Sequence, residues 1–189
     1  QDRVQVFEYS GDVDQLIAFF REVGPDAVFH LAAAVLTSYQ PNQIGTLIQS
    51  NVQFGAEVLE AMTKSGCSKF ISTGSIWQSY NGELYNPVDL YAASKQAFEA
   101  ILKYYTEACG IRAITLRIFD VYGEDDRRPK LLNLVRDIAF TDKVIDVSPA
   151  QQLLDMVHIS DICSAYDAAY HYLADCDQVK NDVFGVYSG

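Results

Sequence analysis

Short runs rich in β-branched and aromatic residues alternate with longer runs of helical periodicity, and this alternation limits the possible fold more than any other feature. The predicted strands cover residues 3–8, 27–31, 69–73 and 111–119, with a short one at 143–147. The predicted helices cover residues 12–23, 42–65, 89–108, 131–140 and 159–173. Strands that alternate with helices of this length predict a doubly wound α/β fold, a parallel sheet covered on both faces.

Residues suited to helix ends support these boundaries. Asp12 is expected to cap the first helix, Pro87 precedes the third, and Gly66 and Gly110 are placed to end the second and third. Beyond Phe119 the alternation becomes less regular. This predicts a smaller, irregular lobe over the carboxyl ends of the strands.

Composition and charge exclude several classes of function. Hydrophobic residues make up 49% of the 189 residues and charged residues 21%, which suits a globular chain with a core. The net charge of -11, from 14 basic and 25 acidic residues, argues against nucleic-acid and anionic-membrane partners. Because the sequence has no apolar run long enough to span a bilayer and no signal-peptide pattern, we expect a cytoplasmic protein.

The cysteine and histidine positions do not indicate a metal site. No two of the four cysteines have CxxC spacing, and the three histidines are scattered. All four cysteines lie in or beside apolar stretches, so we expect them to be buried and reduced. They are Cys67, Cys109, Cys163 and Cys176.

Three of the predicted strands end in stretches of unusual residues, at 31–34, 72–75 and 119–123. In a parallel α/β sheet, ligands bind beyond the carboxyl ends of the strands. We therefore expect the functional site at this edge of the sheet.

Tyr91 and Lys95 are the strongest candidates for chemistry. A spacing of four places both side chains on one helical face, about one turn apart. A phenol has a pKa near ~10, and a neighbouring ammonium lowers that pKa towards the working range. Thr73 would add a hydroxyl at the end of a strand, giving a proton-transfer site beside a substrate carbonyl. The alternative is an exposed helical pair without a catalytic role.

Short motifs lie along the chain at residues 11–13, 28–33, 51–55, 70–73, 91–95, 116–123 and 154–161. In their sequence and order they resemble the motifs of the extended branch of the short-chain dehydrogenase/reductase superfamily. This branch contains NAD-dependent epimerases, dehydratases and reductases of nucleotide sugars. Within the branch, residues 72–78, 85–99 and 125–132 are most similar to CDP-abequose and CDP-paratose synthases.

The resemblance implies a role for each matching residue. Thr73, Tyr91 and Lys95 would be catalytic. NAD(P) would contact Asp12, Val13, Leu31, Ala32, Ala33, Asn51, Ser72, Tyr91, Lys95 and Phe119. The nucleotide sugar would contact Thr73, Gly74, Ser75, Asp120, Arg127, Arg128 and Lys130. Residues 1–120 would form a partial dinucleotide-binding domain and residues 121–189 a partial substrate-binding lobe with a returning helix. A homodimer formed through the two long helices would also be expected.

The sequence departs from the family pattern at several positions. The family's glycine-rich turn and the end of the second strand of its nucleotide-binding half are missing. We therefore expect that the chain begins after that strand and stops before the C-terminal lobe is complete; a cofactor-free domain is the alternative. Without the end of that strand, NAD is not distinguished from NADP. Gly74 and Ser75 replace the Asp-Glu pair of the dehydratases, which argues against water elimination. Leu154 and Asp120 replace the usual Arg and Asn, which leaves the diphosphate to the basic group defined by Arg127, Arg128 and Lys130. A solvated charged turn is the alternative for that group.

The function that these residues favour is an NAD(P)-dependent reductase of the C4 ketone in a CDP-4-keto-3,6-dideoxyhexose. A nucleotide-sugar epimerase that keeps its NAD bound uses the same residues and remains an alternative. A non-catalytic nucleotide-sensing domain is the other. Trp77 and Tyr80 would line the sugar pocket or pack beneath a loop, and we expect His158 to be structural.

Overall fold

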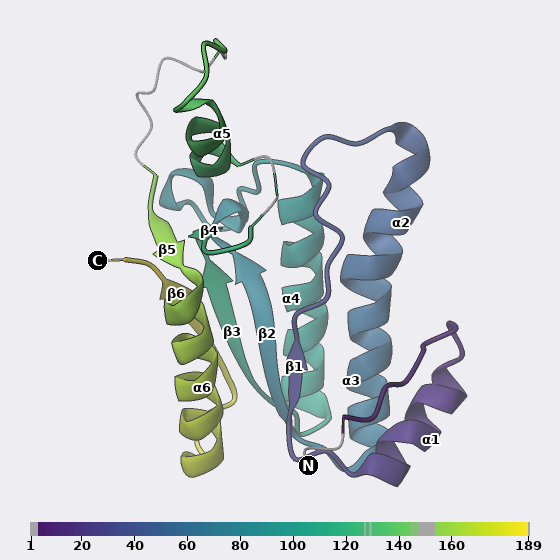
Figure 1. Ribbon diagram of the computed structural model, residues 1–189. Helices are drawn as coiled ribbons and strands as arrows, with labels where there is room; N and C mark the ends of the chain where they lie inside the picture. Colours follow the sequence, from purple (N-terminus) through teal and green to yellow (C-terminus); the bar gives the residue numbers. More distant parts are fainter. Residues whose placement is uncertain (1–3, 127, 129, 145, 147–153, 189) are drawn as a thin grey trace.

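The computed structural model describes residues 4–126, 128, 130–144, 146 and 154–188 (Figure 1). Within this part of the chain, four parallel strands form the main sheet in the order β1-β2-β3-β6. They are β1 (Val28–His30), β2 (Lys69–Ser75), β3 (Arg112–Ile118) and β6 (Asn181–Val186). A two-stranded parallel sheet joins β4 (Asp120–Tyr122) to β5 (Met156–His158).

Helices cover both faces of the main sheet, which confirms the doubly wound α/β prediction. The helices α3 and α4 lie on one face and α6 on the other, and α1 packs against α3 (Figure 1). The α-helices are α1 (Val13–Val23), α2 (Ile44–Ile48), α3 (Phe54–Ser65), α4 (Leu90–Ala108), α5 (Leu131–Ile138) and α6 (Ile159–Asp175). A 3₁₀ turn (Pro41–Gln43) leads into α2, a π-helical turn (Gln49–Gln53) joins α2 to α3, and 3₁₀ turns η3 (Ile76–Gln78) and η4 (Tyr80–Gly82) follow β2.

The predicted helix ends are confirmed where the structure shows their caps. The Asp12 carboxylate accepts hydrogen bonds from the backbone N–H groups of Asp14 and Gln15. Gly66 ends α3 with a φ of 82°, a conformation that glycine adopts without steric cost. Asp89 caps α4 by accepting from the backbone N–H of Ala92 at 2.7 Å, and this cap fixes where the helix carrying Tyr91 and Lys95 begins.

Alternate residues of each central strand face the two helical layers. Along β2, Phe70 is buried against α3 and α4, whereas Ile71 is buried against α6. Both are 0% exposed, which explains why the strand sequence is apolar at consecutive positions. On the first face, Phe98 and Leu102 belong to the core and Tyr105 packs against it, as the helical spacing of these residues predicts.

Two predicted strands are wrong as far as the structure describes them. Residues 4–8 pair with no described strand; side chains hold this segment instead, with Phe7 stacked on Phe19 and the Tyr9 hydroxyl donating to Glu57. Arg3 lies outside the described residues. Residues 143, 144 and 146 are not in a strand either, while 145 and 147 lie outside the described residues. Val144 is 91% exposed, so this segment has no buried face to stabilise a strand.

The expectation of four buried thiols is also corrected. Cys67 is buried and Cys109 and Cys176 are partly buried, but Cys163 is exposed on α6, between the exposed Ser160 and Ser164.

Across the described ranges, no group of three or more His, Cys, Asp and Glu side chains is arranged to hold a metal ion. Nor does any helix among these residues combine the length and apolar character that a membrane span needs.

Gly55 lies where α3 meets α4, and replacing it with alanine should destabilise the fold. A Cβ atom at this position would lie 2.3 Å from Cε2 of Phe98, whose ring is fixed between His30 and Phe70 in the core. We expect Gly55→Ala to lower the free energy of unfolding by about 1–3 kcal/mol. Gly45→Ala is the control, because a Cβ at exposed Gly45 in α2 meets no atom within 4 Å. Urea unfolding of both variants tests this; equal stability would contradict the close contact.

Candidate active site

Asn51 ties the segment that follows β1 to the helix that carries Tyr91 and Lys95. Its side-chain amide donates to Ala34 O at 3.0 Å and to the Ser94 hydroxyl at 2.9 Å, and its Oδ1 accepts from Ala34 N at 2.7 Å. The Ser94 hydroxyl in turn donates to Tyr91 O. Asn51 is 1% exposed and lies in the π-helical turn before α3, a distortion that is frequent at functional sites. The network therefore fixes α4 relative to the end of β1.

Lys95 is buried at the carboxyl end of β2. The side chain is 3% exposed, and its amine donates to the Thr73 backbone carbonyl at 3.1 Å. Tyr91, one turn earlier in α4, is half-buried. The structure thus brings Thr73, Tyr91 and Lys95 to one end of the sheet, and Ser72 lies beside them, 1% exposed.

A half-buried ion pair holds α4 against the sheet just beyond Lys95. Two of the three guanidinium nitrogens of Arg117, Nε and Nη2, donate to the Glu99 carboxylate at 3.2 and 2.7 Å. The third, Nη1, donates to Ser79 Oγ at 2.9 Å. Bidentate contacts of this kind are strong and directional. Glu99 and Arg117 were not predicted as site residues from the sequence, although Glu99 follows Lys95 by one helical turn.

Gly74 fits this crowded strand end because it has no side chain. A Cβ at Gly74 would lie 3.0 Å from atoms of Arg117, Thr115 and Gln78. The Gln78 carbonyl oxygen also accepts from Ser75 N at 2.8 Å. Gly74 and Ser75 are both buried, so protein fills both faces of β2 at this end of the strand.

Tyr166 is a third site residue, after Glu99 and Arg117, that the sequence motifs did not indicate. Its hydroxyl oxygen lies 2.5 Å from Thr73 Oγ1, and Thr73 Oγ1 also donates to His30 O at 3.0 Å. Tyr166 occupies the stripe of α6 that also carries the buried Ile162, Ala169 and Leu173. A tyrosine within such an apolar stripe could have been noticed in the sequence, because a buried phenol hydroxyl needs a hydrogen-bond partner.

The pKa shifts at this site follow from burial and from neighbouring charges. Burial raises the pKa of Tyr91, and Asp89 and Tyr166 raise it further. The expected lowering by Lys95 is therefore wrong for this structure. Burial lowers the pKa of the Lys95 amine to about 8, partly opposed by Glu99. Burial and Lys95 also lower the pKa of His30 to about 4, so His30 is neutral at neutral pH.

A cavity of about 600 Å³ opens beyond β2 and β3. Trp77 and Tyr80, from the turns that follow β2, line it together with Phe119 and Asp120. Ser79, which Arg117 holds, lines it as well, so the cavity lies at the same end of the sheet as Thr73. Trp77 and Tyr80 thus line a pocket; that this pocket holds the sugar stays a prediction. His158 caps α6, the structural role expected of it.

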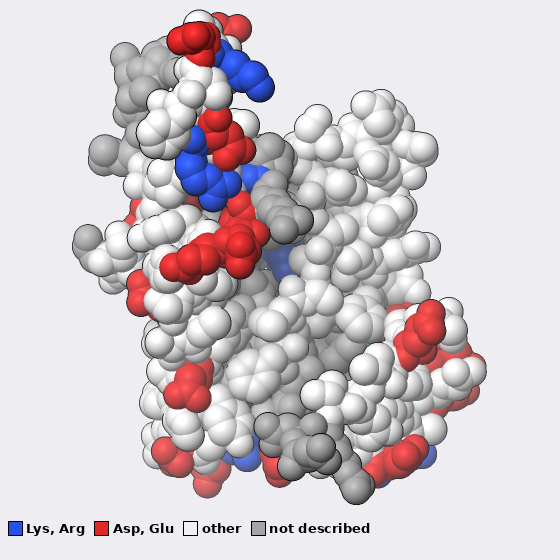
Figure 2. Space-filling view, in the orientation of Figure 1, with Lys and Arg blue, Asp and Glu red and all other residues white. Residues whose placement is uncertain are grey.

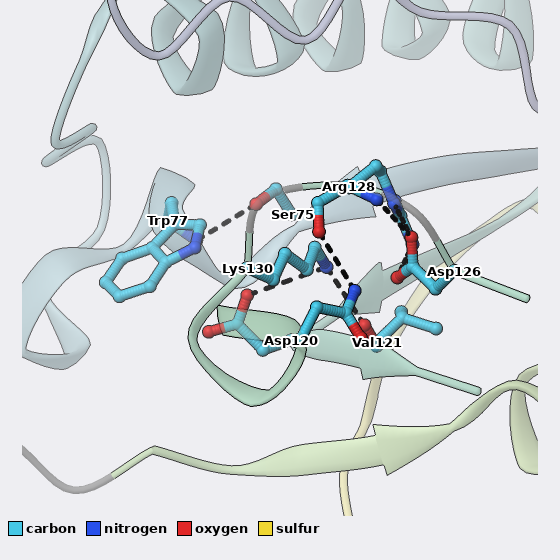
Figure 3. Close-up of polar contacts among 8 residues, drawn as sticks. Ser75, Trp77, Asp120, Val121, Asp126, Arg128 and Lys130 are labelled. Atoms are coloured by element: carbon cyan, nitrogen blue, oxygen red, sulfur yellow. Dashed lines mark hydrogen bonds and ion pairs between the residues drawn. The ribbon is translucent and has the colours of Figure 1, made fainter. Parts of the chain in front are cut away.

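The two described members of the basic group are bound by acceptors of the protein (Figure 3). Arg128 donates from Nε and Nη2 to the Asp126 carboxylate, each at 2.7 Å. The Lys130 amine donates to Val121 O at 3.0 Å and lies 3.9 Å from Asp120 Oδ1. Arg127 lies outside the described residues. A diphosphate contact by this group stays a prediction.

Charge is unevenly spread over the surface. Figure 2 shows basic and acidic side chains interleaved over β4 and α5, whereas the surface over α2 is uncharged in this view. The sequence explains the second feature, since residues 27–56 contain no Asp, Glu, Lys or Arg. Leu31, Ala32 and Ala33 belong to this uncharged stretch, and Leu31 is 58% exposed.

Asp12 and Val13 lie apart from these residues, at the start of α1, which packs mainly against α3. Their proposed contact with the adenine stays a prediction. Phe119 lies between β3 and β4 and lines the 600 Å³ cavity.

Comparison with known proteins identifies the family. The sequence profile of the NAD dependent epimerase/dehydratase family matches residues 10–183. The chain belongs to this family. Among its curated members, a CDP-abequose synthase from Yersinia pseudotuberculosis is 27% identical over 183 residues, covering 96% of this chain and 62% of the relative. One from Salmonella muenchen is 32% identical over 140 residues, covering 72% of this chain and 47% of the relative.

Solved structures share the Rossmann-type fold of the family. The UDP-glucose 4-epimerase from Brucella ovis, in complex with NAD, matches with a TM-score of 0.79 at 20% identity, covering 95% of this chain and 63% of that protein. MoeE5, in complex with UDP-glucose and NAD, matches with a TM-score of 0.77 at 21% identity, covering 95% of this chain and 62% of that protein. The chain thus spans less than two thirds of the length of these relatives.

Burial of the Lys95 amine predicts a pH dependence of stability. The unfolded chain keeps this proton up to pH 10.5, whereas the folded chain releases it near pH 8. Between these values the unfolded state binds more protons, so the free energy of unfolding rises with pH. Relative to Lys95→Met, the native chain should gain about 3 kcal/mol across this range. Urea unfolding of both proteins at a series of pH values measures the gain; a difference independent of pH would contradict burial of a charged amine.

Proposed function

We propose that this protein is an NAD(P)-dependent nucleotide-sugar oxidoreductase that reduces the C4 ketone of a CDP-4-keto-3,6-dideoxyhexose. Such a reaction belongs to the biosynthesis of polysaccharide sugars. The observation that carries the proposal is the buried Lys95 amine, held against the Thr73 carbonyl one turn from Tyr91. The similarity to two CDP-abequose synthases supports the choice of substrate.

The residues present are suited to a nicotinamide cofactor. The Lys95 ammonium has three N–H donors, and among the described residues Thr73 O is its one hydrogen-bond acceptor. A buried donor without a partner is costly, and ribose hydroxyls would supply the missing acceptors. Residues 32–34, which follow β1, are all alanine and carry only short side chains. In this proposal residues 1–120 hold the cofactor and residues 121–189 contribute to the sugar site.

The reaction needs a hydride and a proton. When bound, the reduced nicotinamide supplies the hydride to C4. Tyr91 gives its phenolic proton to the C4 oxygen as negative charge develops there, and its raised pKa keeps that proton in place at neutral pH until then. The Lys95 ammonium stabilises the phenolate that remains, and the Thr73 hydroxyl donates a hydrogen bond to the same substrate oxygen.

The proposed activity is tested with the full-length protein, reduced NADH or NADPH, and a CDP-4-keto-3,6-dideoxy sugar. We expect the near-ultraviolet absorbance of the reduced cofactor to fall in proportion to the sugar consumed. This assay also identifies the preferred cofactor. Conversion of a nucleotide sugar to an isomer without net loss of cofactor would indicate the epimerase. No conversion of any sugar would indicate a nucleotide-sensing domain.

The role of Tyr91 is tested by removing its hydroxyl. We expect Tyr91→Phe to lower kcat by about 10²–10⁴-fold, the usual contribution of a positioned acid, while nucleotide-sugar binding is retained. Tyr104→Phe is the matched control, because Tyr104 lies in the same helix but is 61% exposed. Steady-state kinetics and calorimetric binding measure both effects. Turnover by Tyr91→Phe equal to that of the control would exclude the mechanism proposed here.

We also propose that the protein is a homodimer formed through α3 and α4, the long helices of one face. Sedimentation equilibrium at several protein concentrations would test this. A single species with the mass of one chain would refute it.

A further inference from the structure

Thr73 and Tyr166 form a hydrogen-bonded pair that crosses between the main sheet and α6. The Tyr166 hydroxyl oxygen lies 2.5 Å from Thr73 Oγ1, from the helix that covers the face of the sheet opposite to α4. Phe29 of β1 packs beside Tyr166, with ring centroids 6.2 Å apart. Tyr166 is also close enough to Tyr91 to raise the pKa of that phenol. Tyr166 of α6 therefore holds the Thr73 hydroxyl, while Lys95 of α4, on the opposite face, holds the backbone carbonyl of the same residue.

The hydrogen bonds of Thr73 determine which hydroxyl is the donor. A carbonyl oxygen accepts only, so Thr73 Oγ1 uses its single proton in the contact with His30 O. The Tyr166 hydroxyl must then donate to Thr73 Oγ1. Burial raises the pKa of Tyr166, which keeps this donor protonated.

This arrangement has a consequence for a substrate oxygen. Thr73 can donate to a ligand only if its proton leaves His30 O. The Tyr166 hydrogen bond persists through that change, because it uses a lone pair of Thr73 Oγ1 and leaves the Thr73 proton free. A hydroxyl that accepts a hydrogen bond is also a stronger donor, since hydrogen bonds in a chain polarise one another.

We propose that Tyr166 is a positioning residue whose hydroxyl donates to Thr73 Oγ1 and directs the Thr73 proton towards the C4 oxygen of the substrate. This inference rests on the proposed ketoreductase function and adds a residue to it. Tyr166 does not touch the reacting atoms; it acts through Thr73.

Tyr166→Phe tests the role, and Tyr170→Phe is its matched control. Tyr170 lies one turn later in α6 and also packs against Phe29, at 6.0 Å, but has no hydrogen bond to Thr73 among the described contacts. We expect Tyr166→Phe to lower kcat about three- to tenfold, the usual effect of one lost hydrogen bond, with an unchanged KM for the nucleotide sugar. Tyr170→Phe should keep the native kcat.

Combination with Thr73 variants separates positioning from a general effect on the fold. In a Thr73→Val background, Tyr166→Phe should cause no further loss of kcat, because the hydroxyl through which it acts is gone. In a Thr73→Ser background, the three- to tenfold loss should return. Urea unfolding midpoints should show the same non-additivity between Thr73→Val and Tyr166→Phe, which detects the hydrogen bond without an activity assay.

Failure of this inference is distinguishable from failure of the proposed function. If the native protein reduces the keto sugar but Tyr166→Phe and Tyr170→Phe have equal kcat, the positioning role is overturned and the reductase proposal stands. A tenfold loss in both the Thr73→Val and the native background would also overturn it. If the native protein converts no sugar, both proposals fail together.

Discussion

Burial of the Lys95 amine at the carboxyl end of β2 is the constraint on which the rest of the site depends. An ammonium removed from water needs hydrogen-bond acceptors, and the Thr73 backbone carbonyl provides one of them. This contact fixes the first turns of α4 against the strand end. The Asp89 cap and the Asn51–Ser94 hydrogen bond fix the same turns from two other directions. The helix α4 therefore holds the side chains of Tyr91 and Lys95 at the carboxyl end of the sheet, where parallel α/β sheets bind their ligands.

The environment of the site is suited to donating a proton rather than removing one. Tyr91 is half-buried beside Asp89 and Tyr166, and all three effects raise the pKa of its phenol. A protonated phenol is what a ketone reduction needs at its start, because the developing alkoxide must be neutralised. Burial also lowers the pKa of Lys95, and a negatively charged group beside the amine, such as a phenolate, would favour its protonated form.

Much of the fold could be predicted from the sequence, because its signals are local. The alternation of apolar strands and periodic helices predicted the doubly wound sheet, and Asp12 and Gly66 marked helix ends through hydrogen bonds within a few residues. The two wrongly predicted strands failed for reasons that lie outside their own sequences. Val144 has no buried face to pack against. Residues 4–8 have the composition of a strand, but a strand requires a partner, and no strand among the described residues pairs with this segment. Composition alone does not report a partner.

The candidate site, like the fold, could be predicted from the sequence only in part. The sequence by itself determined that Tyr91 and Lys95 share a helical face, since a spacing of four fixes this within one element. Only the tertiary structure decided that Lys95 is buried against Thr73, and that Tyr166, 93 residues further along the chain, holds the Thr73 hydroxyl. Such contacts depend on how α4 and α6 pack on opposite faces of one sheet. Spacing within a helix is set by backbone geometry, whereas contact between elements is set by burial and strand register along the whole chain.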